Sequence, residues 1–274
     1  MTLLDLSQTP LGARAFLTPQ TRRVELVQIG CGGTGSWLAP KLARIAQAES
    51  TREVAIVLVD PDAIEAKNVG RQNFCPAEIG LAKAVALSRR LALAYGIDAR
   101  ALVRPFAPMP LPPDTLRVYL GCADNAPARR AIHQSLALNG PDRAIWIDGG
   151  NAATGGQVIA GNATTRRALK QAFVIAGYAR RLPDAAMLLP NLVRGRQRPT
   201  GVARAPSCAE AAQANIQSML VNDQVALIMA SYVSDLLAGV LKRFKTSFDS
   251  ASGTMQSLYI TPERIAVSLA RRAW

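Results

Sequence analysis

The sequence is poor in the residues that build metal centres and disulfides. Its four cysteines are scattered over 274 residues without a C-x-x-C pair, and His133 is the only histidine. A structural zinc site needs four such ligands, usually in close pairs, so this spacing argues against one. A single histidine also argues against chemistry that depends on a histidine base. Isolated cysteines indicate a chain without disulfides, as is usual in the cytosol.

Long apolar runs are missing as well. No stretch reaches the roughly 20 apolar residues that a membrane-spanning helix needs. The opening residues, MTLLDLSQTPLGARAF, lack the unbroken apolar segment of a secretory signal. We therefore expect a cytoplasmic protein. Hydrophobic residues make up 49% of the chain, enough to bury the core of one large domain.

Acidic and aromatic residues are scarce. Against 32 lysines and arginines stand 19 acidic residues, a net charge of +13, and aromatic residues make up 5%. Such a charge suits an anionic substrate, an acidic protein partner or nucleic acid. The arginines are dispersed and lack the interleaved aromatic side chains on which single-stranded nucleic acid stacks. Nucleic-acid binding is therefore the minor alternative.

The sequence does contain a glycine-rich turn between two apolar stretches. An apolar run over residues 24–29 precedes GCGGTG, and a helical stretch leads to a second apolar run that stops at Asp60. This order of strand, glycine turn, helix, strand and acid is typical of the unit that binds nucleotides. It predicts a nucleotide site without saying which nucleotide, because dehydrogenases and ATP-using enzymes share it.

The glycines of this turn have separate expected roles. Gly30 would permit the tight turn, Gly32 would let the backbone approach a phosphate, and Gly35 would let the helix pack on its strand. Phosphate would then sit on the positive end of a helix that begins near Ser36. Asp60, at the tip of the second strand, is placed to accept hydrogen bonds from ribose hydroxyls.

Strands and helices alternate in the following residues, which favours a mostly parallel α/β sheet. We expect strands at 24–29, 54–59, 99–103, 117–122, 144–148 and 157–161, and helices at 81–95 and 127–138. Segment 179–206 holds six arginines and one acid, and we expect it to be a mobile basic loop. A helix over 209–244 and closing strands at 259–260 and 265–269 would complete the fold.

Polar side chains gather at the predicted strand ends and in the loop after the second strand. They are Asp60, Asp62, Asn68, Arg71, Gln72, Lys83 and Asp124. A hydride-transferring enzyme needs only the glycines and one acid, whereas an ATP triphosphate needs cations for its phosphates and a carboxylate for Mg²⁺. Lys83 in the first turn of a helix also makes sense beside an anion, although it could be a solvated surface lysine. Asp124 or Asn125 could equally be the N-cap of the helix that follows.

Five motifs in order resemble the ThiF/MoeB superfamily of adenylating enzymes, which includes ubiquitin-activating enzymes. They are GCGGTG, DPD at 60–62, NVGRQ at 68–72, GLAK at 80–83 and CADN at 122–125, and the resemblance covers about residues 24–215. Within the superfamily the chain looks most like the ThiF-family proteins of bacterial PRTRC systems. That similarity lies in VGRQNFCPAEIGLAKA, LPDAAMLLPNL and PSCAEA.

The resemblance implies a Rossmann-like, doubly wound, mostly parallel sheet with helices on both faces, a C-terminal helix and short antiparallel strands. The chain would be a single adenylation domain over 1–274. Its parts would be an N-terminal arm (1–23), a nucleotide-binding core (24–161), a basic crossover loop with the cysteine (179–208), and a C-terminal helix with closing strands (209–274).

The resemblance also implies a reaction. ATP with Mg²⁺ would adenylate the C-terminal carboxylate of a ubiquitin-like or sulfur-carrier protein and release pyrophosphate. Asp124 would hold Mg²⁺, and Cys208 would capture the acyl group as a thioester or persulfide, or would be a helix-start residue without chemistry. The implied catalytic residues are Arg71, Lys83, Asp124 and Cys208. The implied nucleotide-binding residues are Gly30, Gly32, Gly33, Gly35, Asp60, Asp62, Asn68, Gln72 and Asn125.

Three departures from the family pattern qualify this prediction. The two C-x-x-C pairs that hold zinc in many relatives are absent, and Arg14 is only a candidate for the arginine that relatives insert across a homodimer. As a third departure, we expect no appended ubiquitin-like or rhodanese domain, so the carrier would be a separate chain. Alternative functions are adenylation of a short peptide or small carboxylate, a non-catalytic basic nucleotide-binding regulatory module, and an NAD-dependent oxidoreductase.

Overall fold

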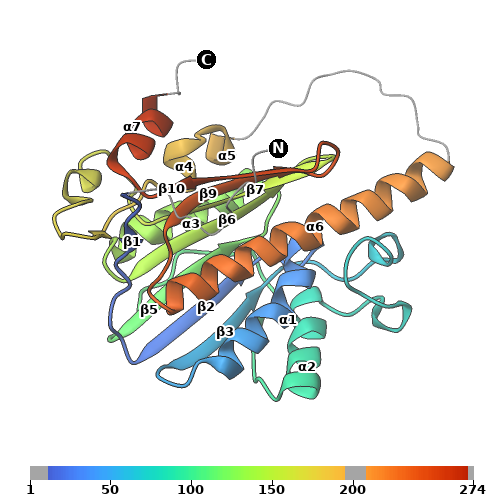
Figure 1. The fold of residues 1–274 in the computed structure, drawn as a ribbon. Helices are drawn as coiled ribbons and strands as arrows, with labels where there is room; N and C mark the ends of the chain where they lie inside the picture. Colours follow the sequence, from blue (N-terminus) through green and yellow to red (C-terminus); the bar gives the residue numbers. More distant parts are fainter. Residues whose placement is uncertain (1–11, 195–207, 271–274) are drawn as a thin grey trace.

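A single eight-stranded sheet organises the molecule (Figure 1). The computed structural model describes residues 12–194 and 208–270, and for 208–218 it describes the backbone alone. Five strands are parallel in the order β6-β5-β2-β3-β4. Their bounds are β2 (Arg23–Ile29), β3 (Glu53–Val59), β4 (Arg100–Leu102), β5 (Thr115–Gly121) and β6 (Ala144–Asn151). The parallel sheet predicted from the alternating pattern is thereby confirmed.

Three antiparallel strands extend the sheet beyond β6. They are β7 (Gly155–Gly161), β9 (Arg243–Asp249) and β10 (Thr254–Tyr259), with β10 at the outer edge. A pair of two-residue strands, β1 (Ala15–Phe16) and β8 (Tyr178–Ala179), stands apart from the main sheet. The N–H of Arg14 donates to the carbonyl of Ile260 (2.9 Å), so the N-terminal arm lies against the C-terminal part of the chain.

The parallel strands are largely buried and mostly apolar because helices cover both faces. In β2, Leu26 is buried in one layer and its neighbour Val27 in the other. The first layer is closed by α1 (Gly33–Ala48), α2 (Lys83–Tyr95) and α6 (Cys208–Leu237). The second is closed by α3 (Ala126–Asn139), α4 (Ala185–Leu188) and α5 (Asn191–Arg194). Figure 1 shows α6 running beside α1 across the first face.

Short helices and one glycine complete the connections. The loop between β3 and α2 contains two 3₁₀ turns, η1 (Ala66–Asn68) and η2 (Pro76–Glu78), and a third, η3 (Ala168–Gln171), precedes β8. Helix α2 ends at Gly96, whose φ of 64° is the left-handed conformation that suits glycine at a helix end. Within the described ranges, no helix combines the length and apolar character that crossing a membrane requires.

The C-terminal part corrects two predictions. The helix expected over 209–244 ends at Leu237, and residues 243–249 form β9, in which alternate side chains such as Phe244 and Phe248 are buried. Gly239, with φ of 70°, separates the two elements. The strand expected at 265–269 is part of α7 (Pro262–Ala270), where Ile265 and Leu269, one helical turn apart, are both buried.

Part of the segment predicted as a mobile loop has regular structure. Residues 178–194 contain β8, α4 and α5. The guanidinium groups of Arg180 and Arg181 both bind the Asp142 carboxylate, at 2.8 and 2.7 Å. These ion pairs attach the segment to Asp142, which lies just before β6. Residues 195–207, the rest of the predicted loop, lie outside the described residues.

Candidate active site

A cavity of about 770 Å³ opens at the carboxyl ends of the parallel strands, around the glycine turn. Ligands collect at this edge in open α/β sheets because the loops leaving the strands converge there. Of the residues predicted from the sequence, it is lined by Gly30, Gly32, Gly33, Asp60, Asp62, Asn68, Arg71, Gln72, Lys83, Asp124 and Asn125. The side chain of Cys208 lies outside the described residues; its backbone begins α6.

The glycine turn is held from beneath. Gly30 has a φ of 98°, and the buried Gln28 side chain donates from Nε2 to the carbonyls of Gly30 and Gly35, both at 3.1 Å. A Cβ atom on Gly35 would overlap the Gly30 carbonyl oxygen. Gly35 therefore permits close packing of α1. It is not among the residues that line the cavity, and its assignment to ligand binding remains a prediction.

Helix α1 presents its N-terminal turn to the cavity. It begins at Gly33, earlier than the start near Ser36 that the sequence suggested, and no side chain caps its first turn. Uncapped N–H groups and the positive end of the helix dipole favour an anion at this point. A phosphate group is the ligand that this geometry suits.

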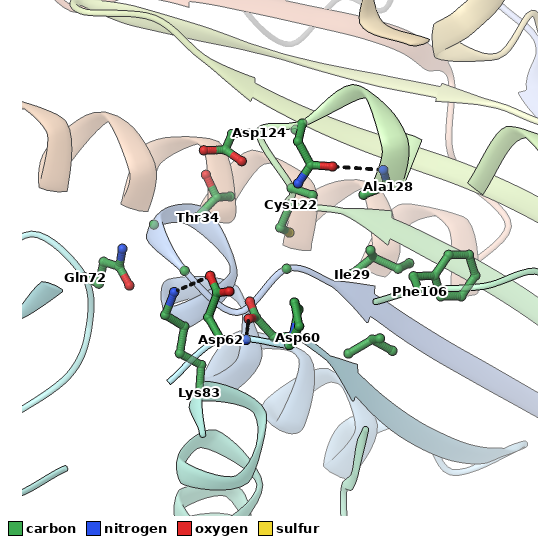
Figure 2. A pocket seen from close by; sticks show the side chains of 18 of the residues that line it. Ile29, Thr34, Asp60, Asp62, Gln72, Lys83, Phe106, Cys122, Asp124 and Ala128 are labelled. Atoms are coloured by element: carbon green, nitrogen blue, oxygen red, sulfur yellow. Dashed lines mark hydrogen bonds and ion pairs between the residues drawn. The ribbon is translucent and has the colours of Figure 1, made fainter. Parts of the chain in front are cut away.

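Asp60 supports the turn from the neighbouring strand. Its carboxylate accepts hydrogen bonds from the N–H groups of Cys31 (2.6 Å) and Asp62 (2.8 Å). Figure 2 draws the bond from Asp62 as a dashed line. Burial raises the pKa of this carboxyl, while the two backbone hydrogen bonds and the Lys83 charge oppose the rise. The predicted contact with ribose remains a prediction.

Lys83 has an anionic partner within the chain. It is the first residue of α2, only 7% exposed, and its Nζ lies 3.0 Å from Oδ2 of Asp62. Asp62, by contrast, has a side chain that is 64% exposed at the cavity wall. The position of Lys83 at the start of a helix predicted an anion nearby, and in the structure that anion is the Asp62 carboxylate. A phosphate entering the cavity would compete with Asp62 for the same ammonium group.

Three more predicted residues come from the loop after β3. The Oδ1 of Asn68 accepts the N–H of Glu65 (2.9 Å), and Nε of Arg71 donates to the carbonyl of Lys67 (3.1 Å). The Gln72 side chain lies beside Gly32, and its buried Oε1 has no hydrogen-bond partner among the described residues. This loop therefore supplies a polar wall that faces the glycine turn.

The opposite wall is formed where β5 leads into α3. Asn125 is the N-cap of α3, because its Oδ1 accepts the N–H of Ala128 (2.9 Å). Asp124 is left exposed at the cavity, and Figure 2 shows its carboxylate and the Lys83 side chain with the glycine turn between them. The sequence left the capping role open between these two residues, and the structure assigns it to Asn125.

Several lining residues were missed by the sequence reasoning. Phe106, with Ile29 and Val59, makes one end of the cavity apolar (Figure 2). Its position after β4, at the carboxyl edge of the sheet, was a signal that could have revealed it. Asn151 and Asn222 also line the cavity, and Asn222 lies beside Thr34 in the first turn of α1. Asn222 gave no local signal, because it lies in the middle of a long helix far from the turn in sequence.

A buried ion pair closes the cavity floor. Nε of Arg129 lies 3.0 Å from Oδ1 of Asp148, and its Nη2 donates to the carbonyl of Gly149 (3.3 Å). Burial raises the pKa of Asp148 to about 6, although the Arg129 charge opposes the rise. Removing either partner would leave a buried charge unpaired, so this pair is a structural requirement of the site.

The donor set suits a magnesium ion bound together with phosphates. Among residues 12–194 and the described part of 208–270, no three histidine, cysteine or acidic side chains cluster as a ready-made metal cage. Mg²⁺ is usually held by one or two carboxylates, substrate phosphates and water. Asp124, an exposed carboxylate at the cavity, fits that role.

Comparison with solved structures identifies the fold. PaaA superposes with a TM-score of 0.55 at 16% identity, over 88% of this chain and 65% of PaaA. E. coli MccB in complex with AMPCPP and MccA superposes with a TM-score of 0.52 at 16% identity, over 87% of this chain and 64% of MccB. The chain thus spans just under two thirds of the length of these proteins. No curated protein matches it by sequence.

Comparison with protein-family models shows the family to which the chain belongs. The model of the ThiF family matches residues 17–264, which include the glycine turn, the polar loop after β3 and the Asp124 wall. The five motifs found in the sequence had indicated the same relationship. The chain belongs to the ThiF family.

Proposed function

We propose that the protein uses ATP and Mg²⁺ to adenylate the C-terminal carboxylate of a ubiquitin-like or sulfur-carrier protein. The observation that carries this proposal is one cavity in which Lys83 and Arg71 lie on one wall and Asp124 on the other, around an uncapped helix N-terminus. Membership of the ThiF family supports it. MccB, which shares the fold, has been crystallised with ATP and with AMPCPP together with MccA.

The two ends of the cavity suit the two ends of ATP. Ile29, Val59 and Phe106 offer apolar surface for adenine, and Asp60 lies between this end and the turn. The phosphates would lie on the first turn of α1, where Gly32 leaves room for them. Asn68, Arg71, Gln72 and Lys83 would bind the β- and γ-phosphates.

Charge stabilisation would supply most of the catalysis. An oxygen of the substrate carboxylate forms a bond to the α-phosphorus, the bond from that phosphorus to the bridging oxygen breaks, and pyrophosphate leaves with the electron pair. The carboxylate is already a nucleophile, so no general base is needed. Lys83 would exchange Asp62 for a phosphate and stabilise the departing pyrophosphate. Mg²⁺, held by Asp124, would neutralise phosphate charge when bound.

The substrate and later steps are the finer part of the proposal. The carrier would be a separate chain, and the net charge of +13 favours an acidic partner. Cys208 would accept the acyl group after adenylation. A homodimer, the division into arm, core, crossover loop and C-terminal part, and the place in the PRTRC branch belong to the same proposal.

ATP–pyrophosphate exchange tests it directly. We would measure exchange with Mg²⁺, with and without candidate ubiquitin-like carriers, short peptides and small carboxylates. The variants are Asp124→Ala, Cys208→Ala and, as a matched control, Asp98→Ala at an exposed site outside the cavity.

We expect carrier-dependent exchange that is lost in Asp124→Ala and kept in Cys208→Ala and Asp98→Ala. Exchange supported only by peptides or small carboxylates would replace the carrier with the smaller substrate. A folded, ATP-binding protein that exchanges with no substrate would favour the non-catalytic regulatory module.

A further inference from the structure

Asn222 connects α6 to the phosphate-binding turn. Its side chain is 4% exposed and lines the cavity. Its Oδ1 accepts hydrogen bonds from Oγ1 of Thr34 (3.1 Å), in the first turn of α1, and from Nδ2 of Asn151 (2.5 Å), at the end of β6. A single amide group thus joins three elements that are far apart in the sequence.

The contact with α1 depends on glycine. A Cβ atom on Gly33 would lie 2.8 Å from Nδ2 and 2.9 Å from Oδ1 of Asn222, which is closer than real Cβ atoms come to such groups. Glycine at this position therefore lets the amide sit directly on the turn that would receive a phosphate. Asn222 therefore belongs to the candidate site and also contributes to the packing of α6.

The chemistry of this wall is neutral. Thr34, Asn151 and Asn222 carry no charge, whereas the cation Arg71 comes from the loop after β3 and Lys83 begins α2. A carboxylate in place of the Asn222 amide would face the bound phosphates and repel them. An alanine would leave the turn without the acceptor that orients Thr34.

We propose that Asn222 is a positioning residue of the nucleotide site, holding the first turn of α1 in the geometry that binds the triphosphate. The proposal rests on the proposed function, because it assumes that phosphates bind at this turn. It makes α6 part of the phosphate-binding apparatus through a side chain that lies outside the family motifs found in the sequence.

Calorimetric titration of the full chain tests the proposal with two probes. Mg·AMPCPP reports on the whole nucleotide, and adenosine reports on the apolar end alone. The variants are Asn222→Asp, Asn222→Ala and Asn151→Asp, whose exposed position makes misfolding a minor concern. Gln224→Glu is the matched control, since it adds the same charge to α6 at a residue that binds Ser250 outside the cavity.

We expect Asn222→Asp to weaken Mg·AMPCPP binding at least about tenfold and to leave adenosine binding unchanged, because only phosphates meet the new charge. Asn222→Ala and Asn151→Asp should weaken it about threefold or more, and Gln224→Glu should bind as wild type does. If Asn222→Asp does not fold, the other two variants decide.

Unchanged Mg·AMPCPP affinity in the variants would overturn the proposal, and so would an equal loss of both ligands, which would indicate a purely structural role. Failure of the wild-type protein to bind Mg·AMPCPP would instead overturn the proposed function, and this proposal with it. The wild-type titration therefore separates the two failures.

Discussion

At the scale of single residues, the glycines of the turn divide between the fold and the ligand. Gly35 has no room for a Cβ atom, because the nearest atom is the backbone carbonyl oxygen of Gly30, which cannot move aside. At Gly32 a Cβ atom would meet only the Gln72 side chain, at 3.6 Å, which is an ordinary contact. Substitutions at these two positions of the same turn should therefore have different effects, one on the stability of the fold and the other on ligand binding.

We predict that Gly35→Ala lowers the free energy of unfolding by about 3 kcal/mol, since overpacking against backbone has no easy relief. Gly32→Ala should change it by less than about 1 kcal/mol, the scale of a cap substitution, yet weaken Mg·AMPCPP binding severalfold by occupying phosphate space. Thermal unfolding and calorimetry measure the two effects. A Gly35→Ala protein as stable as wild type would contradict the packing argument.

The polar residues of the motifs could be placed from the sequence for a simple reason. Asp60 directly follows the buried strand β3, and Asp124 comes shortly after the end of β5. Parallel strands bring their carboxyl ends to one edge of the sheet. The division of roles was out of reach. Whether Asn125 or Asp124 caps α3, and whether Lys83 meets a phosphate or Asp62, depends on side-chain geometry that spacing does not determine.

At the scale of elements, an ion pair ties α3 to α4. His133 on α3 places Nδ1 2.6 Å from Oδ2 of Asp184, a fully buried carboxylate whose Oδ1 also accepts the N–H of Met187 in α4. The hydrogen bond to Asp184 raises the pKa of His133, and burial opposes the rise. Because α4 and α5 cover the second face of the sheet, this pair helps to hold that layer closed.

The pH dependence follows from the sign of the shift. A histidine whose pKa is raised on folding contributes stability that is complete below its ordinary pKa and is lost as pH rises through the folded value. Asp148, whose pKa is about 6, is mostly ionised by pH 7, so its titration contributes little to the pH dependence above that value. We therefore expect wild-type stability to fall as pH rises above neutral and His133 loses its proton.

Urea unfolding at a series of pH values from 6.5 to 9 checks this prediction, with His133→Gln as the comparison. The variant should be less stable at the acid end and should lose less stability than the wild type between pH 6.5 and 8. Above pH 8 the buried thiols of Cys31 and Cys122, whose pKa values burial raises, add the same pH dependence to both proteins. A variant with the wild-type slope would assign the dependence to another group.

Elements with a strong local signal were predictable, and those defined by distant contacts were not. The strand, turn, helix and strand from β2 to β3 alternate so clearly that their bounds differ from expectation by a few residues. The first two residues of β9 were predicted as the end of a helix and the rest of the strand was missed, because its pairing with β7 and β10 is a tertiary contact. In residues 265–269, the spacing of Ile265 and Leu269 indicates a helix only once it is known that these two side chains are the buried ones.

At the scale of the whole molecule, the candidate site joins the two halves of the sequence. The cavity is lined by residues from β2 through to α6, so a ligand there contacts elements that would separate on unfolding. A ligand that binds only the folded state raises its stability, by about 2.7 kcal/mol at a hundredfold excess over Kd. Thermal unfolding thus reads out which nucleotide the cavity accepts.

We predict that Mg·ATP at that excess raises Tm by about 5 °C, whereas NADH at the same concentration leaves it unchanged. The reason is that Arg71, Lys83 and Asp124 suit a triphosphate with its metal and have no role in hydride transfer. Differential scanning fluorimetry with both nucleotides makes the measurement. A larger shift with NADH than with Mg·ATP would revive the oxidoreductase alternative.

The length of α6 sets an order of events. Cys208 begins this helix, and with a rise of about 1.5 Å per residue its start lies roughly 20 Å along the axis from Asn222 at the cavity. If Cys208 accepts the acyl group, the adenylate formed at the cavity and the thiol have to come together across this separation. A stopped assay should then show a burst of pyrophosphate before any thioester, with a lag whose length reports this approach. During that interval the mixed anhydride is open to hydrolysis, so the yield of transfer becomes a competition between water and the thiol.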